Sequence, residues 1–283
     1  MESTLYAARA EAVARGAEAP GHVNEPGLAD RLTAIGAALS ERPARARGET
    51  GQKNNLGDLN APTALLLGCA YLKDPELLAA VVKLAEHLLG SVRILNACCG
   101  APWLHLGRPE EARQARRDLK QKLRGAQQLI VADPGCMVTL GASTDITSRL
   151  LLDVAVEEKE RFSRLPASAP EPPYRWHDPC QLGRGLGRYT EPRLLLEQLN
   201  GARPLEFTAA GEDAACSGGG GALPRTLPGI SADIADARIA DHSALGGGTI
   251  VTACGSSLRR FRSRGASAVD LHQLLARALP DHG

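Results

Sequence analysis

Aromatic residues are scarce in this sequence, and neither sign of charge is in excess. Phe, Trp and Tyr make up 3% of the 283 residues, which leaves few rings for stacking on nucleic-acid bases or for sandwiching a flavin. The 33 Lys and Arg are nearly balanced by 32 Asp and Glu. The composition therefore gives no reason to expect a nucleic acid as partner.

Long apolar runs and nucleotide-binding glycine motifs are also lacking. No stretch approaches the roughly 18 uninterrupted apolar residues of a membrane span, and the start, Met-Glu-Ser-Thr, lacks the basic and apolar segments of a secretory signal. The run Gly183-Arg-Gly185-Leu-Gly187 follows Cys180 with the wrong spacing for a dinucleotide turn. We expect a soluble, cytoplasmic protein with no transmembrane segment and no bound FAD or NAD.

Cysteine is the residue that is present in an informative pattern. The chain has seven, and an odd number in an unsecreted protein argues for thiolates in metal or redox chemistry rather than for disulfides. One shift of 118 positions carries Cys98 onto Cys216 and Cys136 onto Cys254, and it carries Cys99 onto Ser217. The cysteine pattern therefore nearly repeats, with one cysteine replaced by serine.

Each cysteine or cysteine pair follows a predicted strand. Apolar runs predict strands at residues 64–68, 92–95 and 129–132, and again at 174–177, 204–207 and 249–253. Helical patterns at 75–89, 109–124, 192–199, 231–242 and 270–279 alternate with them. Alternating strands and helices imply parallel sheets, whose carboxyl edges gather the loops. We expect the cysteines to converge there.

The fold prediction is an α/β protein of two tandem repeats, each a small parallel sheet flanked by helices, related by pseudo-twofold symmetry. Residues 1–58 form an N-terminal arm with one predicted helix at 25–41. The first repeat covers 59–165 and the second covers 166–283. A proline-rich stretch at 166–173 is the predicted linker.

Four thiolates at one sheet edge suit either zinc or an iron-sulfur cluster. Spacing alone does not choose between them. The adjacent Cys98 and Cys99 favour a cluster, because two neighbouring thiolates cannot both chelate one tetrahedral ion without strain but can reach different irons.

The motifs resemble the cysteine-rich CCG domain family, which includes the B subunit of heterodisulfide reductase, the glycolate oxidase iron-sulfur subunit and the lactate-utilisation iron-sulfur protein. The resemblance covers about residues 63–280. It is carried by Gly68-Cys69, Ala97-Cys98-Cys99-Gly100-Ala101-Pro102, Asp133-Pro134-Gly135-Cys136, His177-Asp178-Pro179-Cys180, Cys216-Ser217-Gly218-Gly219-Gly220 and Val251-Thr252-Ala253-Cys254.

The resemblance implies the ligands and the function. Its candidate cluster ligands are Cys69, Cys98, Cys99 and Cys136 in the first repeat, and Cys180, Cys216 and Cys254 in the second. It implies a 4Fe-4S cluster in an electron-transfer subunit of a flavin-linked oxidoreductase complex, which passes electrons or, in one branch, reduces a disulfide. The implied partners are a flavoprotein and a ferredoxin-like or quinone-linked subunit, and any membrane association runs through a partner.

The chain departs from the family at several positions. Ser217 stands where the second repeat often has a paired cysteine, and the final Cys-x-x-Cys is reduced to Cys254. In the first repeat either Thr139 takes the last place of that motif or Asp133 replaces its first cysteine. We expect the cluster in the first repeat.

The second site is left with several alternatives: a three-thiolate cluster, a zinc site completed by His177, or no metal. Missing ligands also motivate a different function, a zinc-binding scaffold or assembly protein without redox activity. Four arginines just beyond Cys254 either dock an acidic partner, offset cluster charge or form a solvated face; they are Arg259, Arg260, Arg262 and Arg264.

Overall fold

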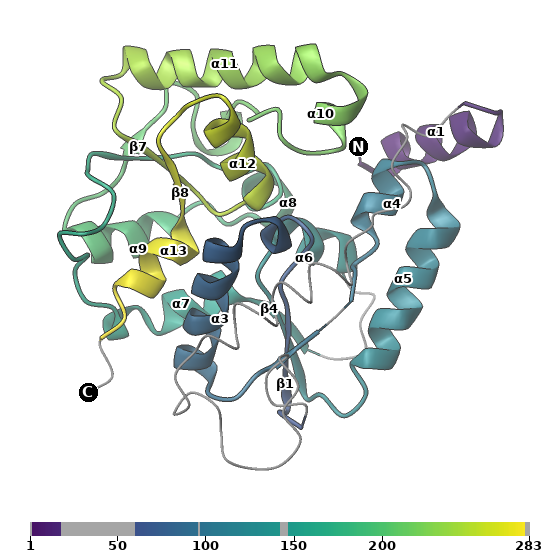
Figure 1. The fold of residues 1–283 in the computed structure, drawn as a ribbon, viewed down its shortest axis with the longest axis horizontal. Helices are drawn as coiled ribbons and strands as arrows, with labels where there is room; N and C mark the ends of the chain where they lie inside the picture. The colour runs from purple at the N-terminus through teal and green to yellow at the C-terminus, as the bar shows by residue number, and fades with distance from the viewer. Residues whose placement is uncertain (1, 18–59, 96, 142–146, 281–283) are drawn as a thin grey trace.

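Two parallel four-stranded sheets with flanking helices build the molecule (Figure 1). The computed structural model describes residues 2–17, 60–95, 97–141 and 147–280. The predicted helix at 25–41 lies outside the described residues, as does most of the 1–58 arm. The predicted α/β class with two parallel-sheet repeats is confirmed.

The two sheets share one topology. The first has the strand order β2-β1-β3-β4 and the second has β6-β5-β7-β8, with every neighbouring pair parallel. In each sheet the first strand in the chain therefore lies between the second and the third. The strands are β1 (Thr63–Leu66), β2 (Arg93–Ile94), β3 (Gln128–Val131), β4 (Thr147–Leu150), β5 (Tyr174–Trp176), β6 (Leu205–Glu206), β7 (Thr249–Thr252) and β8 (Ala268–Asp270).

Helices connect the strands and cover both faces of each sheet. The 3-10 helices are η2 (Tyr71–Lys73), η3 (Lys159–Arg161) and η4 (Gly211–Asp213). The α-helices are α1 (Glu2–Ala14), α3 (Pro75–Leu89), α4 (Ala101–His105), α5 (Pro109–Lys122), α6 (Pro134–Leu140), α7 (Leu151–Glu157), α8 (Gly183–Leu186), α9 (Glu191–Asn200), α10 (Leu223–Thr226), α11 (Pro228–Ala244), α12 (Gly255–Ser263) and α13 (Leu271–Arg277). No helix within the described ranges has the length and apolar character to span a bilayer.

Helix α3 shows how local sequence sets these boundaries. Asp74 caps its first turn by accepting a hydrogen bond from the Leu77 backbone N–H, and Pro75 occupies the first helical position. Gly90 ends it with a φ of 76°, a conformation that glycine adopts without strain. The predicted bounds of this helix are confirmed.

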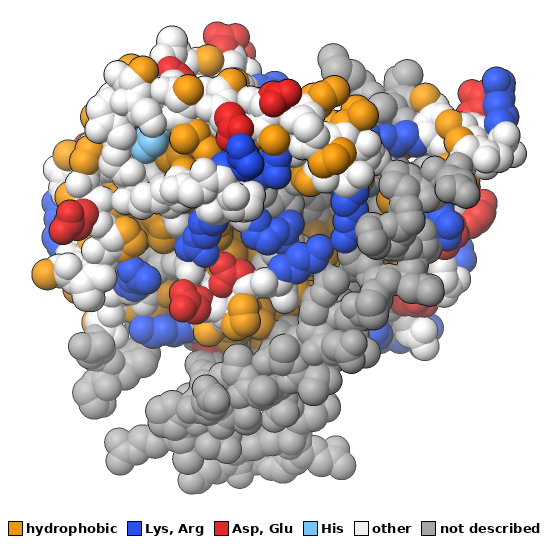
Figure 2. Space-filling view, turned by 45° about the horizontal axis from the view of Figure 1, so that its top comes forward, with side chains coloured by type: hydrophobic (Ala, Val, Ile, Leu, Met, Phe, Trp, Pro, Cys, Tyr) orange, Lys and Arg blue, Asp and Glu red, His pale blue; other side chains and the backbone are white. Residues whose placement is uncertain are grey.

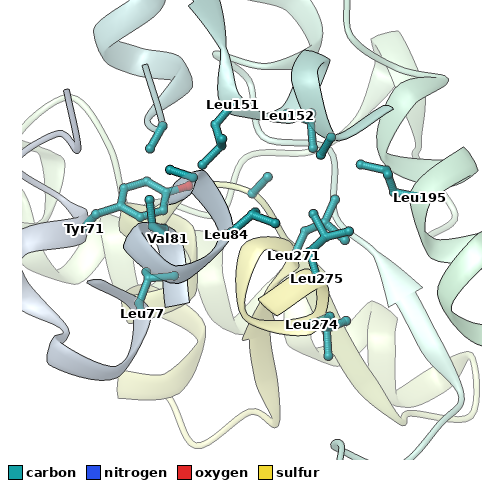
Figure 3. Packing of buried hydrophobic residues seen from close by; sticks show 14 of the residues in the cluster. Tyr71, Leu77, Val81, Leu84, Leu151, Leu152, Leu195, Leu271, Leu274 and Leu275 are labelled. Atoms are coloured by element: carbon teal, nitrogen blue, oxygen red, sulfur yellow. The ribbon is translucent and has the colours of Figure 1, made fainter. Parts of the chain in front are cut away.

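One hydrophobic cluster joins the two repeats. In the first sheet, Leu65 and Ile130 face this cluster, while Leu66 and Leu129 face a separate one with α5. The shared cluster also takes Trp176 from the second sheet, together with residues of α3, α7, α9 and α13. Helices α3 and α13 lie side by side between the sheets (Figure 1), and Figure 3 shows Leu84 of α3 beside the leucines of α13. The two repeats therefore share a core.

Candidate metal centre

The carboxyl ends of both sheets meet at the contact between the repeats. A Cβ added to Gly255 of the second repeat would lie 3.0 Å from the Ala70 carbonyl carbon of the first, and one added to Gly185 would lie 2.7 Å from the Val138 Cγ2. Ala70 directly follows Cys69, and Gly255 directly follows Cys254. The loops that carry the cysteines of the two repeats therefore pack against each other.

The first thiol set, defined as Cys69, Cys98, Cys99 and Cys136, forms a chain of interacting side chains. The Sγ atoms of Cys69 and Cys98 are 3.8 Å apart, and Cys99 interacts with the side chains of Cys98 and Cys136. The thiols of this set come from the loops after β1, β2 and β3. The expected convergence of these four cysteines is thus present in the structure.

Gly100 gives the Cys98-Cys99-Gly100 turn its shape. Its φ is 93°, and a Cβ there would lie 2.9 Å from the Ala112 carbonyl oxygen of α5. Its backbone N–H donates to the Cys98 Sγ at 3.3 Å. A donor at this sulfur stabilises a thiolate, so the glycine serves both the turn and the sulfur.

Neighbouring thiols and burial together raise the pKa of Cys98, of Cys99 and of Cys136, which favours their protonated forms when no cation is nearby. Cys99 and Cys136 are buried, and Cys69 and Cys98 are half-buried. A hydrogen bond from Cys99 lowers the pKa of Cys136, but burial and the charge of Asp133 outweigh it and raise that pKa to about 12. The thiolates therefore need a positive partner, which bound iron or zinc supplies.

Asp133 lies beside both sets of cysteines. It caps α6 through hydrogen bonds from the Gly135 backbone N–H at 2.7 Å and the Cys136 backbone N–H at 3.3 Å. Burial raises the pKa of Asp133 to about 6, against the lowering effect of these two bonds. Gly68 makes room for this carboxyl group, because a Cβ there would lie 2.4 Å from the Asp133 Cβ.

The second thiol set, defined as Cys180, Cys216 and Cys254, is more open to solvent. Cys180 and Cys216 are exposed, and Cys254 is half-buried. The Gly218 backbone N–H donates to the Cys216 Sγ at 3.2 Å, as Gly100 does to Cys98. Burial, with the charge of Asp133, raises the pKa of Cys254 to about 12.

Aligning the strands and helices of the two repeats shows which residue of one repeat corresponds to each cysteine of the other. Asp133 and Cys254 each occupy the N-cap position of the helix after the third strand of their sheet, two residues beyond that strand. Cys136 and Ser257 are each the third residue of that helix. Asp133 therefore corresponds to Cys254, and the structural partner of Cys136 is Ser257, not the Cys254 that the shift of 118 positions indicated.

Two serines occupy the places of two contacting cysteines. Ser217 corresponds to Cys99, and its Oγ lies 2.8 Å from the Ser257 Oγ. The same pair in the first repeat is Cys99 and Cys136, whose side chains interact. The second repeat has thus exchanged one thiol pair for a hydroxyl pair and kept the contact.

His177 packs among aromatic rings rather than among sulfurs. Its ring lies edge-on to Phe207 and Phe261, and its Nδ1 accepts a hydrogen bond from the Arg238 Nε at 3.4 Å. Burial and the charge of Arg238 lower the pKa of His177 to about 3. Its side-chain contacts among the described residues involve none of the cysteines, so its role as a zinc ligand stays a prediction.

The donors fit an iron-sulfur cluster better than a single ion. Within the described part of the chain, no three His, Cys, Asp or Glu side chains are placed to hold one metal ion together, and the first thiol set runs as a line of pairwise contacts. Cysteine thiolates bind separate irons of a cluster. Four soft donors of this kind match that group.

Arginines beyond Cys254 divide into two groups. Arg262 pairs with Asp74 at 2.9 Å and Arg264 with Asp236 at 2.6 Å, so both hold helices together. Arg259 instead donates to the Ala70 carbonyl and Arg260 to the Ser231 carbonyl. Lys and Arg side chains gather across the middle of the face in Figure 2. Arg259 and Arg260 therefore place positive charge near the cysteine loops.

Sequence reasoning missed one cation on the first repeat. The Arg116 Nε donates to the Cys99 carbonyl oxygen at 3.4 Å. Arg116 belongs to a group of basic residues on α5 whose spacing is that of a solvated helix face. Only the packing of α5 against the Cys98-Cys99 turn distinguishes it from its neighbours.

Comparison with protein families agrees with this geometry. The family model of the cysteine-rich domain, CCG, matches residues 63–141 and 174–259. Each range contains one thiol set and the first three strands of one sheet. The chain therefore belongs to the cysteine-rich CCG domain family, with two copies of the domain.

The chain is similar over part of its length to components of archaeal reductases. It is 26% identical over 176 residues to the D subunit of dihydromethanophenazine:CoB--CoM heterodisulfide reductase of Methanosarcina mazei, covering 56% of this chain and 42% of that relative. It is 25% identical over 166 residues to the B subunit of fumarate reductase (CoM/CoB) of Methanothermobacter marburgensis, covering 56% and 32%. The match spans less than half of each relative.

Among solved structures, an aspartate racemase from Picrophilus torridus aligns with a TM-score of 0.36 at 12% identity, covering 76% of this chain and 90% of the racemase. A likeness this distant supports no conclusion about the site.

Proposed function

We propose that this protein is an iron-sulfur electron-transfer subunit of a reductase complex. The observation that carries the proposal is the first thiol set, in which four thiols from three strand-end loops interact with one another. Membership of the CCG family and similarity to reductase components support it.

The four cysteines of the first thiol set are the proposed ligands of a 4Fe-4S cluster. Such a cluster accepts and releases single electrons when bound. The Gly100 backbone N–H favours the thiolate at Cys98, and burial of Cys99 and Cys136 keeps water from the inner side. Arg116 and Arg259 place positive charge on the two flanking loops.

The partners are proposed by analogy with the relatives. The heterodisulfide reductase and fumarate reductase relatives are each one component of a larger reductase, and this chain spans less than half of either. We infer a flavoprotein subunit as one neighbour in the electron path and a ferredoxin-like or quinone-linked subunit as the other. The proposed unit is the pair of repeats, 59–165 and 166–283.

A zinc-binding scaffold is the second candidate. It is favoured by the second thiol set, which keeps three thiols after two cysteine positions became Ser217 and Ser257. Three thiols and a fourth ligand from outside the set suit tetrahedral zinc. In that case the metal contributes folding energy rather than redox chemistry.

Metal analysis separates the two candidates. Iron, zinc and acid-labile sulfide are measured on protein purified without oxygen, for the native chain, Cys98→Ser and Cys216→Ser. These two cysteines occupy equivalent positions, each accepting a glycine N–H. We expect about four irons and four sulfides per chain, lost in Cys98→Ser and retained in Cys216→Ser. Zinc without sulfide would contradict the electron-transfer proposal.

A further inference from the structure

A buried polar connection runs from the first thiol set into the second repeat. Tyr71 lies two residues after Cys69, is fully buried, and donates its hydroxyl to the Asp270 Oδ2 at 3.4 Å. Asp270 pairs in register with Thr252, two residues before Cys254. Tyr71 thus joins the loop of one thiol set to the strand beside the other; Figure 3 shows its side chain within the core that the repeats share.

Asp270 in turn holds His272. The Asp270 Oδ1 lies 2.7 Å from the His272 Nδ1 and also accepts the His272 backbone N–H at 2.9 Å. Both side chains are almost completely buried, at 0% and 1% exposed. With Tyr71 the carboxylate accepts three hydrogen bonds, which fix its position beside the imidazole.

The other nitrogen of His272 has no hydrogen-bond partner in the part of the chain that the structure describes. Its Nε2 is buried and makes no hydrogen bond within the described residues. Because the carboxylate favours a proton on Nδ1, the neutral ring carries its lone pair on this Nε2. A buried basic nitrogen held by a carboxylate is prepared to bind a proton and form an ion pair.

The charges around this pair are mixed in sign. Asp133 and Cys254 interact with Tyr71, and Asp133 also interacts with Asp270. Cations approach from two other helices. From α12, Arg259 lies near Asp133, and Arg262 bonds to Gln273 and pairs with Asp74. From α3, Lys83 bonds to the Ala276 carbonyl. Helix α9 contributes leucines. No cation among these contacts bonds to Asp270 itself, so the imidazole is its closest basic group in the described structure.

We propose that His272 binds a proton at Nε2 when the iron-sulfur site gains an electron, so that electron uptake is coupled to proton uptake. The inference rests on the proposed function. The electron comes from a flavin- or ferredoxin-class donor and the proton from solvent, and no other bond forms or breaks. An added negative charge in a poorly solvated region raises the proton affinity of nearby bases, and protonation leaves the net charge of the region unchanged.

The test is the midpoint potential of the cluster-loaded protein as a function of pH. Potentiometric titrations followed by electron paramagnetic resonance are made at pH 6, 7, 8 and 9. We expect the native potential to fall with rising pH, approaching about 59 mV per pH unit, the value of a tenfold change per proton and electron. His272→Gln is expected to have a nearly constant potential.

Two further variants test whether the effect is specific to His272. His242→Gln is the matched control, because His242 is also buried but bonds to the Gly248 carbonyl at the opposite edge of the second sheet; it should keep the native slope. Asp270→Asn keeps the shape of the side chain but removes the negative charge that would balance a protonated His272. The pH range over which the midpoint potential falls should therefore move to lower pH. Asp270→Asn also serves if His272→Gln does not fold.

The outcomes separate the two proposals. A cluster whose potential is independent of pH, or a native slope retained in His272→Gln, overturns the role of His272 and leaves the electron-transfer function standing. Native protein that binds no iron and sulfide overturns both. Direct measurement of proton release or uptake in weakly buffered solution during reduction checks the stoichiometry, with about one proton per electron expected.

Discussion

Replacing Asp133 with Asn should stabilise the metal-free protein at neutral and alkaline pH. Asp133 is 7% exposed, and its carboxylate accepts hydrogen bonds from two backbone N–H groups at the start of α6. An ionised carboxylate there is poorly solvated. Asparagine keeps an oxygen for both backbone donors and carries no charge.

The magnitude follows from linkage between protonation and folding. Burial raises the pKa of Asp133 from 3.8 to about 6, so the folded protein binds this proton more tightly than the unfolded chain does. The resulting stability is fully present below about pH 4 and is lost as the pH rises through about 6. The difference corresponds to about 3 kcal/mol. Asp133→Asn should gain up to that amount at pH 8 and about half of it at pH 5.

Urea unfolding of metal-free protein, followed by circular dichroism at pH 8 and pH 5, measures this difference. Asp74→Asn is the matched control, since Asp74 also caps a helix that begins with proline but pairs with Arg262. Asp74→Asn should be less stable than the native protein, because it loses the ion pair with Arg262. The reasoning is refuted if Asp133→Asn is no more stable at pH 8, or if its advantage does not shrink at pH 5.

Two other substitutions test the packing and the ligand positions. Gly68→Ala should destabilise the chain by roughly 2–5 kcal/mol in urea unfolding and lower its iron content, because a residue with a Cβ is strained at φ 90° and this Cβ would also clash with Asp133. The control Gly90→Ala, at φ 76° with open space around the added Cβ, should lose only about 1–2 kcal/mol. Equal losses in the two variants would contradict the clash with Asp133. Changing Ser217 and Ser257 together to cysteine should add up to about four irons per chain, whereas unchanged iron and sulfide content would show that ligand number does not limit the second thiol set.

Sequence patterns predicted the fold where strands were apolar and followed by cysteine. All six predicted strands have counterparts within a few residues, but β4 and β8 were not predicted. β4 begins Thr147-Ser148-Arg149, and β8 is three residues long, so neither presents an apolar run. Both are edge strands, where one side needs less burial.

The short helices that follow the third strand of each sheet were also missed. Helix α6 begins with Pro134-Gly135 and α12 with Gly255, residues that weaken helix propensity inside a segment but are tolerated in a first turn. The cysteine spacing concealed their equivalence, because it aligned Cys136 with Cys254. The register of the preceding strands gives the correspondence to Ser257.

The buried groups between the repeats could not be predicted from one sequence. Asp270 and His272 lie 199 and 201 positions from Tyr71 along the chain, and no local pattern relates them. Only the packing of η2 against the end of β8 brings them together.

The core that both repeats share has a consequence for their independence. Leucines of α3 and α13 are buried against each other, so separating the halves would expose a large apolar surface at about 25 cal/mol per Å². Neither half should persist alone, and the chain should unfold in one cooperative transition despite its two sheets. A ligand that binds only the folded chain at one thiol set then stabilises the other half as well, by about 4 kcal/mol at a thousandfold excess over its dissociation constant. Both thiol sets would then depend on a single folding equilibrium.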